Sequence, residues 1–392
     1  MGILDGITVL ELCEVYQGPL AGQCLGDFGA RVIKVERGPG GDPLRGADAH
    51  ARKHGLMSSF FAAANRNKES ICLDLKSDAG RDALWALVDQ ADVLLHNYRP
   101  GVMEKIGLGY EPLAARNPRL IYGAASGYGQ TGPWSQMAGQ ELLIQSLSGV
   151  AGRRGVPGEP PRPPQYVNPP FTDYSSGMLL VQGVLLALLE RQQSGLGQQV
   201  NVCLLDAAMS VQSLEASSEL NYAQEARWFD MALNFPALAQ DGWLTVLGFF
   251  RDNPLRLICQ ALEIEDLSVT MQLPGAAEQH AARDEVARQL APYFAQRTVN
   301  DAVERLQRIG VLAAPVLSLD QALHFEQVSH NGMIRTVPVK GQPDMKVIDH
   351  PLRLSRTPHS MRSGPPQLGE HTAQVLAELG FDAARTRTAS GG

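Results

Sequence analysis

Residues 7–36 read ITVLELCEVYQGPLAGQCLGDFGARVIKVE, and this segment indicates the fold class. ITVLEL (7–12) has the short apolar pattern of a buried strand, and the polar turn EVYQGP (14–19) follows it. LAGQCLGDFGA (20–30) has a helical pattern, and RVIKVE (31–36) is a second strand. A strand, turn, helix and strand in this order predict the start of a parallel α/β sheet. The first turn has no GxGxxG motif, so the usual dinucleotide-binding fingerprint is absent.

Short apolar segments and helical patterns continue to alternate further along the chain. The next predicted strands are SICLDL (70–75), DVLLHN (92–97) and RLIYGAAS (119–126), with a helix over 79–91. A strongly apolar helix is expected over 175–192, and a second helix over 204–222. This alternation predicts an α/β protein with a Rossmann-like domain and a parallel sheet.

The pattern changes between about residues 226 and 325, which predicts a second domain. WLTVLGF (243–249) is a predicted strand, and 282–296 and 300–311 are predicted helices. We therefore expect residues 1–225 to form the N-terminal part of a large domain, 226–325 a small α+β domain, and 326–392 a segment that returns to the large domain. The polar tail ARTRTASGG (384–392) is expected to fray.

Composition narrows the class of protein. The chain has 392 residues, of which 44% are hydrophobic, as in ordinary globular proteins. Its five cysteines are odd in number and form no CxxC pair, which argues against a disulfide framework and a structural zinc site. The acidic N-terminus is unlike a secretory signal, and the apolar run 177–189 is too short to span a bilayer. A cytoplasmic protein that does not enter a membrane is the expectation.

A local excess of basic residues contrasts with the net charge of −7, which itself disfavours nucleic-acid binding. Residues 31–68 contain eight basic residues and three acidic ones. Two interpretations are open: a solvated surface, which is the commoner case, or a site for a phosphate-rich small molecule.

Asp173 stands alone at the joint between a Pro-rich segment and the apolar helix, in the sequence YVNPPFTDYSSGM (166–178). Aspartate is a favoured helix N-cap, so a structural role is the simpler interpretation. A carboxylate at a helix N-terminus also meets free N–H groups and the positive end of the helix dipole, which favour its ionised form. It could therefore serve as a covalent catalyst.

Several blocks of the sequence resemble the class III CoA-transferase family, which includes formyl-CoA transferase, carnitine CoA-transferase and α-methylacyl-CoA racemase. The resemblance covers about residues 4–382 and is densest over 4–130 and 171–210. The blocks that carry it are DGITVLEL, VIKVERGPGGDPLR, FFAAANRNKESICLDLKS, ADVLLHNYRPGVMEKIGLGYEPLAARNPRLIYGAASGYGQTGP, ERQQSGLGQQVNVCLLDA and PPQLGEHTAQVLAELG.

This resemblance implies a fold, an assembly and a reaction. The implied fold has a Rossmann-like large domain, built from both ends of the chain, with an inserted smaller domain, and two such chains interlock as a homodimer. The implied activity is transfer of CoA from an acyl-CoA to a small carboxylic acid, for which a dicarboxylate is the candidate acceptor and succinyl-CoA the candidate donor. CoA is a substrate, and no metal or other cofactor is implied.

The resemblance also implies site residues. Asp173 matches the family nucleophile, which forms an anhydride and then an aspartyl-CoA thioester, and the small residues 175–177 leave room for a thioester. Glu141 matches a glutamate of formyl-CoA transferase-like members and is expected to help to position the acceptor. The matches to CoA-binding positions are Tyr16, Gln17, Arg37, Leu73, Lys76, Asn97, Tyr98, Arg99, Lys105 and Gln140.

Two alternatives to transfer remain: a 2-methylacyl-CoA racemase and a CoA-binding protein without turnover. The racemases use a His-Asp pair in a segment resembling AGHD, whereas this chain has AGQE (138–141). Gln140 replaces the histidine, and an amide is not a general base near neutral pH. Asp173 argues against a protein without turnover. Transfer is therefore the favoured prediction.

The chain lacks the glycine-rich loop that covers the nucleophile in formyl-CoA transferase. The equivalent stretch, LNFPALAQDGW (233–243), has one glycine. We expect fixed groups to exclude water instead, with Phe235 as the aromatic candidate, unless this stretch is only an interdomain linker. Arg153 and Arg154 could bind a second carboxylate, although an exposed basic pair is the simpler interpretation.

Overall fold

The structure is a computed structural model, and it describes residues 2–152, 163–224 and 232–391. The chain folds into two compact units, one formed by residues 1–212 and 332–392 and the other by residues 213–331. The boundaries between the two units lie at 212/213 and 331/332. The domain limits at 226 and 325 that were expected from the sequence remain predictions.

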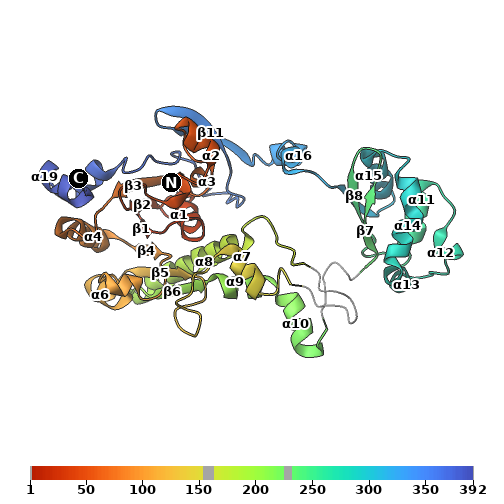
Figure 1. Cartoon of the computed structure of the whole chain (residues 1–392), viewed down its shortest axis with the longest axis horizontal. Helices are drawn as coiled ribbons and strands as arrows, with labels where there is room; N and C mark the ends of the chain where they lie inside the picture. The colour runs from red at the N-terminus through yellow and green to blue at the C-terminus, as the bar shows by residue number, and fades with distance from the viewer. Residues whose placement is uncertain (1, 153–162, 225–231, 392) are drawn as a thin grey trace. The chain divides into compact units, whose positions relative to one another are not determined.

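The large unit is built around a parallel six-stranded sheet (Figure 1). The strand order is β3-β2-β1-β4-β5-β6, and every neighbouring pair is parallel. Leu10 of β1 lies opposite Ile33 on one side and Leu94 on the other. The strands are β1 (Thr8–Leu12), β2 (Arg31–Glu36), β3 (Lys68–Cys72), β4 (Val93–His96), β5 (Ile121–Ser126) and β6 (Gln199–Cys203).

Helices cover both faces of this sheet, because alternate residues of each strand point to opposite sides. Leu10 belongs to a core that includes α4, whereas its neighbour Val9 belongs to a core that includes α1 and α8. The helices between the strands are α1 (Gln17–Asp27), α2 (Ala49–His54), α3 (Ser59–Ala62), α4 (Asp78–Gln90), α5 (Val102–Lys105), α6 (Tyr110–Arg116), α7 (Glu141–Leu147) and α8 (Phe171–Ser194), and α9 (Leu204–Val211) follows β6. A short 3-10 helix, η1, covers Pro43–Arg45.

Helix α8 is longer than the sequence pattern predicted. It has 24 residues, and by length and composition alone it could cross a membrane. The helix extends beyond the run 177–189 on both sides, so the length argument made for that run does not cover the whole helix, and the expectation that the protein does not enter a membrane stays a prediction. Length and composition are weak evidence, because core helices of soluble proteins meet the same criterion. Leu180, Val184 and Ala187 of α8 pack into the core on one face of the sheet.

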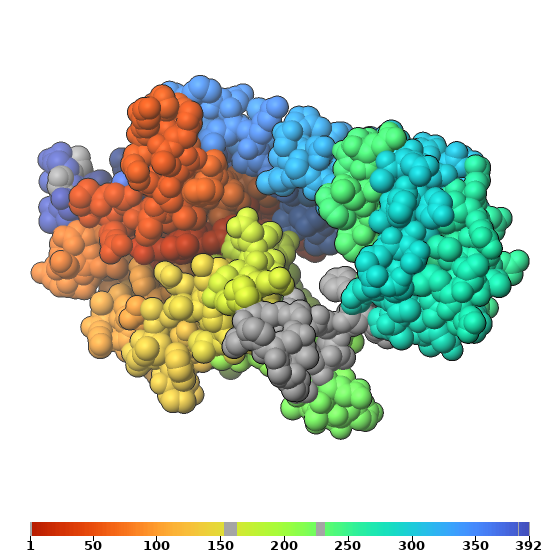
Figure 2. Space-filling view, turned by 45° about the vertical axis from the view of Figure 1, so that its right-hand side comes forward, coloured from red at the N-terminus to blue at the C-terminus, as the bar shows by residue number. Residues whose placement is uncertain are grey.

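The segment after residue 332 returns to the large unit, where it lies beside the N-terminal elements (blue against red and orange in Figures 1 and 2). It contains the hairpin β10 (Ile334–Val339) and β11 (Gln342–Ile348) and the helices α18 (Thr372–Glu378) and α19 (Ala383–Ser390). Val337 and Val347 pack against Phe61 of α3. The expectation that the tail 384–392 frays is wrong, because residues 383–390 form a helix whose Ala389 is fully buried.

The segment LGEHT (368–372), part of the block PPQLGEHTAQVLAELG, has a structural role at the edge of the sheet. The hydroxyl of Thr372 accepts a hydrogen bond from the backbone N–H of Cys72, and the backbone N–H of His371 donates to the carbonyl of Ser70. Because an edge strand exposes unpaired backbone groups, these contacts satisfy β3 where no further strand pairs with it.

The small unit has an antiparallel sheet of β7 (Asn234–Leu238), β8 (Trp243–Leu247) and β9 (Leu312–Pro315). Its helices are α10 (Ser213–Tyr222), α11 (Pro254–Leu262), α12 (Leu267–Thr270), α13 (Ala276–Ala281), α14 (Arg283–Phe294), α15 (Val299–Arg308), α16 (Leu319–Leu323) and α17 (Glu326–His330). Phe235 lies on the buried side of β7, packs edge-on against Phe294, and is 4% exposed. Within this chain it is a core residue, so neither the shield nor the linker interpretation of 233–241 holds.

Candidate active site

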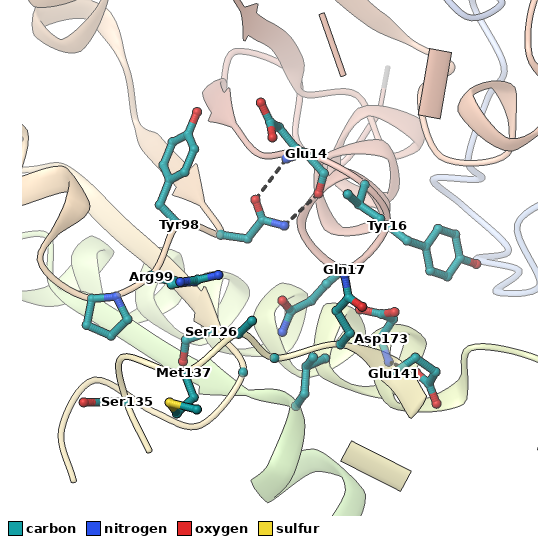
Figure 3. A pocket seen from close by; sticks show the side chains of 18 of the residues that line it. Glu14, Tyr16, Gln17, Tyr98, Arg99, Ser126, Ser135, Met137, Glu141 and Asp173 are labelled. Carbon is teal, nitrogen blue, oxygen red and sulfur yellow. Dashed lines mark hydrogen bonds between the residues drawn. The ribbon is translucent and has the colours of Figure 1, made fainter. Parts of the chain in front are cut away.

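A cavity of about 480 Å³ opens at the carboxyl ends of β1, β4 and β5 (Figure 3). The strand order reverses between β1 and β4, and open α/β sheets bind ligands at such a switch point. The turns after these strands and the first turn of α8 form its walls. Eight of the predicted site residues line this one cavity: Tyr16, Gln17, Asn97, Tyr98, Arg99, Gln140, Glu141 and Asp173.

Asp173 lies in the first turn of α8, beside Gln17 and Glu141 (Figure 3). Its carboxylate accepts no hydrogen bond from the residues that the structure describes, so it is not the helix cap. Burial and the nearby charge of Glu141 raise the pKa of Asp173 to about 7. The net shift is opposite in direction to the effect expected from the helix N-terminus, whose N–H groups at Thr172 and Asp173 bond to Glu141 instead. The result is a half-buried carboxyl group that faces a cavity and changes its charge near neutral pH.

Glu141 is the group that caps α8. Its carboxylate accepts hydrogen bonds from the backbone N–H groups of Thr172 and Asp173, both at 3.0 Å, and from the Thr172 hydroxyl. The Gln145 side chain donates a further hydrogen bond to it. Glu141 thus takes the free donors of the helix N-terminus and holds Asp173 in place. These bonds give it a structural role that the sequence did not predict.

The small residues after Asp173 allow α1 and α8 to approach closely. Ser176 is fully buried and accepts a hydrogen bond from the Gln17 side chain. A Cβ on Gly177 would lie 2.7 Å from the backbone oxygen of Gln17, so only glycine fits there. At these two positions the small side chains make room for α1, and the expectation that residues 175–177 leave room for a thioester stays a prediction.

The turn after β1 has a strained backbone that other elements hold. Val15 has a φ of 68°, which is unusual for a β-branched residue. Its N–H donates to Asp42, the backbone N–H and carbonyl of Glu14 both bind the Asn97 side chain, and the carbonyl of Cys13 accepts from Lys34. Asn97 lines the cavity, but its side-chain amide is hydrogen-bonded to the backbone of Glu14.

Half of the eight basic residues in 31–68 form ion pairs inside the protein. Lys34 and Lys68 are fully buried and share Glu11, and Lys34 also pairs with Asp42 at 3.0 Å. Arg66 pairs with Asp27, and Arg45 pairs with Glu36. Neither the solvated-surface nor the phosphate-site interpretation applies to these four residues, whereas Arg31, which pairs with Glu69, is 38% exposed and belongs to the surface. The sequence did carry a signal for this burial: Glu11 and Lys34 are charged residues within the otherwise apolar strand patterns 7–12 and 31–36.

A second cavity, of about 820 Å³, adjoins the end of β2 and shares Tyr98 with the first cavity. Arg37, Leu73, Lys76 and Tyr98 line it. Ser390 and Gly391, at the C-terminal end of α19, line it too, and the sequence analysis did not single them out. Arg37 contacts Glu14 at 3.5 Å and is largely exposed, and Leu73 is also part of the core. Lys105 ends α5 and lines neither cavity.

A third cavity, of about 260 Å³, lies on the other side of Tyr16. Its lining is mostly apolar and includes Tyr174, Met178 and Met333. Tyr16 lines both this cavity and the first one, whereas Asp173 lines only the first.

Gln140 begins the loop-to-helix transition at α7 and lines the first cavity. No histidine lines this cavity in the described part of the chain. Within the described residues, no group of three or more His, Cys, Asp or Glu side chains could hold a metal ion. Arg153 and Arg154 lie outside the described residues.

Comparisons with known proteins agree with this architecture. The family model "CoA-transferase family III" matches residues 4–372. A succinate–glutarate CoA-transferase of Agrobacterium fabrum is 32% identical over 96% of this chain and 95% of its own length. An acyl-CoA transferase of Fusarium pseudograminearum is 33% identical over 97% of this chain and 86% of its own length. The crystal structure of a CAIB/BAIF family protein from Brucella suis superposes with a TM-score of 0.85 at 30% identity, covering 96% of this chain and 99% of that one.

The chain is an α/β protein with a parallel six-stranded sheet and a separate small antiparallel sheet. A cavity that contains the Asp173 carboxylate lies at the switch point of the parallel sheet, where such folds bind ligands. The chain belongs to CoA-transferase family III.

Proposed function

We propose that this protein transfers CoA from an acyl-CoA donor to a small carboxylic acid, with Asp173 as the nucleophile. The observation that carries the proposal is the Asp173 carboxylate, which faces the first cavity without a hydrogen-bond partner among the described residues. The Agrobacterium relative is named for two dicarboxylates, succinate and glutarate. This name supports succinyl-CoA as the donor and a dicarboxylate as the acceptor here.

The proposed reaction is a series of acyl exchanges. The Asp173 carboxylate attacks the donor thioester carbonyl, the C–S bond breaks, and a mixed anhydride and CoA thiolate form. The thiolate then attacks the aspartyl carbonyl and releases the donor acid, which leaves an aspartyl-CoA thioester. The acceptor carboxylate attacks this thioester, giving a second anhydride and the thiolate. The thiolate finally attacks the acceptor acyl carbonyl, and free Asp173 returns.

Each attack creates an oxyanion, and the N-terminus of α1 is placed to stabilise it. The N-cap of α1, Tyr16, makes no side-chain capping bond, and Tyr16 and Gln17 line the cavity beside Asp173. Backbone N–H groups in a water-poor site are effective oxyanion donors. Hydrogen bonds to Asn97, Asp42 and Lys34 fix the turn before α1, so these donors need little reorganisation.

CoA fits a path through the first two cavities, which meet at Tyr98. The thioester lies in the cavity that contains Asp173, and the nucleotide lies in the larger one. Arg99 lines the first cavity, and Arg37 and Lys76 line the second, so basic side chains are available to the phosphate groups along this path. We retain Lys105 as a phosphate ligand only as a prediction from the family resemblance.

We also propose the interlocked homodimer that the family resemblance implies. The chain alone leaves large apolar side chains exposed on α7 and α8, among them Leu142, Leu147, Leu186 and Leu189, which are 48–59% exposed. Exposed apolar side chains on adjoining helices are typical of a surface that a partner covers.

The test is a donor–acceptor matrix in which mass spectrometry identifies the CoA esters formed. Succinyl-CoA and a panel of mono- and dicarboxylic acids are incubated with the wild type and with Asp173→Asn, which keeps the shape but removes the nucleophile. We expect transfer by the wild type and a loss of at least about 10³-fold in the variant. Near-normal turnover of Asp173→Asn would refute the mechanism.

The racemase alternative makes a different prediction. A racemase exchanges the α-proton of a 2-methylacyl-CoA, and the racemases that the resemblance brings in use a His-Asp pair for this. A carboxylate such as Asp173 is a possible base, but Gln140 replaces the histidine and no histidine lines the cavity among its described residues. Rapid deuterium incorporation from heavy water without CoA transfer would favour the racemase. CoA binding with neither activity would favour a non-catalytic protein.

A further inference from the structure

Helix α19 is anchored next to the second cavity. Ala389 is fully buried in the core that includes Leu73, and its carbonyl accepts a hydrogen bond of 2.8 Å from the backbone N–H of Asp74. The hydroxyl of Ser77 donates to the Thr388 carbonyl, and Arg385 pairs with Asp82 at 3.0 Å. The end of this helix is therefore tied to the loop after β3, which carries Lys76.

The residues that follow these anchors form part of the cavity wall. Ser390 and Gly391 line the 820 Å³ cavity together with Arg37, Gly38 and Pro39 from the loop after β2. The Ser390 carbonyl oxygen lies 4.0 Å from the position of a Cβ on Gly38, so the end of α19 approaches the loop after β2. Gly391 caps the helix at a φ of 87°, a left-handed conformation that favours glycine.

The lining of this cavity offers groups for both parts of a nucleotide. Arg37 and Lys76 supply positive charge, next to the carboxylates of Glu36 and Asp74. The end of α19 supplies carbonyl groups. The carbonyls of Thr388 and Ala389 are already bonded, whereas that of Ser390 accepts no hydrogen bond from the described residues. The basic side chains suit phosphates, and the unbonded carbonyl suits the amino group of a base.

We propose that Ser390 and Gly391 form part of the nucleotide subsite and contact the adenosine end of CoA. This inference rests on the proposed function, because it needs CoA to occupy the second cavity. The adenine amino group donates toward the Ser390 carbonyl, and the phosphates lie toward Arg37 and Lys76. The end of α19 is then a binding element for the nucleotide, with no direct part in the chemistry at Asp173.

Two substitutions of opposite charge at position 390 test the proposal in the full chain. Ser390→Asp adds a negative charge to the wall of the nucleotide cavity, and Ser390→Arg adds a positive one, and each charge acts on the phosphates of CoA across the cavity. We expect CoA to bind about fivefold more weakly to the first and more tightly to the second, as for a charge pair at a partly solvated site. Pantetheine, which lacks the nucleotide, should bind all these proteins equally. Calorimetric titration with CoA and with pantetheine measures both.

Ala384→Asp is the matched control, because it adds the same charge to the exposed first turn of α19. It should leave CoA affinity unchanged. Equal CoA affinity of wild type, Ser390→Asp and Ser390→Arg would overturn the inference, as would a parallel change for pantetheine. Failure of the wild type to bind CoA would instead overturn the proposed function, and this inference with it.

Discussion

The charge of Asp173 depends on its burial and on its neighbour Glu141, and this neighbour also holds it in position. Glu141 accepts the N-terminal hydrogen bonds of α8, so its own negative charge stays close to Asp173. Burial and this charge raise the pKa of Asp173 to about 7. A carboxylate with a raised pKa is more basic and so a stronger nucleophile once it is ionised. Its ionised fraction at low pH is correspondingly smaller.

This arrangement predicts a pH dependence of CoA transfer. Only the ionised carboxylate attacks, so activity should rise with pH through a midpoint near 7 and be lost as pH falls below it. Glu141→Gln removes the repelling charge and should lower this midpoint by about one pH unit. The pH profile of kcat measures the shift.

Glu111→Gln is the control for that shift, because Glu111 lies on the exposed first turn of α6 and does not line the cavity. Its midpoint should equal that of the wild type. A Glu141→Gln midpoint equal to or above that of the wild type would contradict the electrostatic explanation.

At the scale of elements, the buried charges of the sheet support the turn that carries Tyr16 and Gln17. Asp42 pairs with fully buried Lys34 and also accepts from the backbone N–H of Val15. Removing one partner of a buried ion pair leaves the other charge without compensation. The strained conformation of Val15 loses one of its restraints at the same time.

We therefore expect Asp42→Asn to lower the free energy of unfolding by about 3–5 kcal/mol. Asp89→Asn breaks the exposed pair with Arg116 and should cost less than about 1 kcal/mol. Urea unfolding followed by circular dichroism compares the two variants. Equal losses would show that the buried network does not hold the turn.

Phe235 gives a second prediction at this scale. Its ring packs against Phe294 in the core of the small unit, so Phe235→Ala should lower the stability of that unit by about 3–5 kcal/mol. Leu238→Ala, at an exposed position of the same strand, is the control and should cost much less. Thermal unfolding measures both. A stable Phe235→Ala protein with faster acyl-CoA hydrolysis would restore the shielding role.

For the whole molecule, the proposed interlocked dimer has consequences that a simple docked dimer lacks. Interlocked chains separate only when part of the fold opens, so association and folding are linked. Light scattering should find the dimer at nanomolar concentrations. In urea, the loss of the dimer and the loss of helical circular dichroism should coincide. A folded monomer, either on dilution or at intermediate urea, would contradict this prediction.

Local patterns in the sequence were sufficient for part of the architecture. The β-turn-α-β order at 7–36 predicted the parallel sheet, because apolar strand segments joined by a helix leave few other topologies. The same patterns placed Asp173 at the start of a long helix and Tyr16 and Gln17 in the turn after β1. They missed β6, whose residues alternate in exposure, and the hairpin of β10 and β11.

The remaining properties depend on residues that are far apart in the chain. Glu141 caps a helix that begins thirty residues later, the basic residues of 31–68 pair with acids such as Glu11 and Asp27, and α19 reaches the second cavity. Strand order brings these groups together, and burial then makes each unpaired charge costly, so partners are selected in space. By itself the sequence determined the fold class and the position of Asp173 in the chain. Only the tertiary structure decided the raised pKa of that carboxyl group, the use of the basic residues and the lining of the nucleotide cavity.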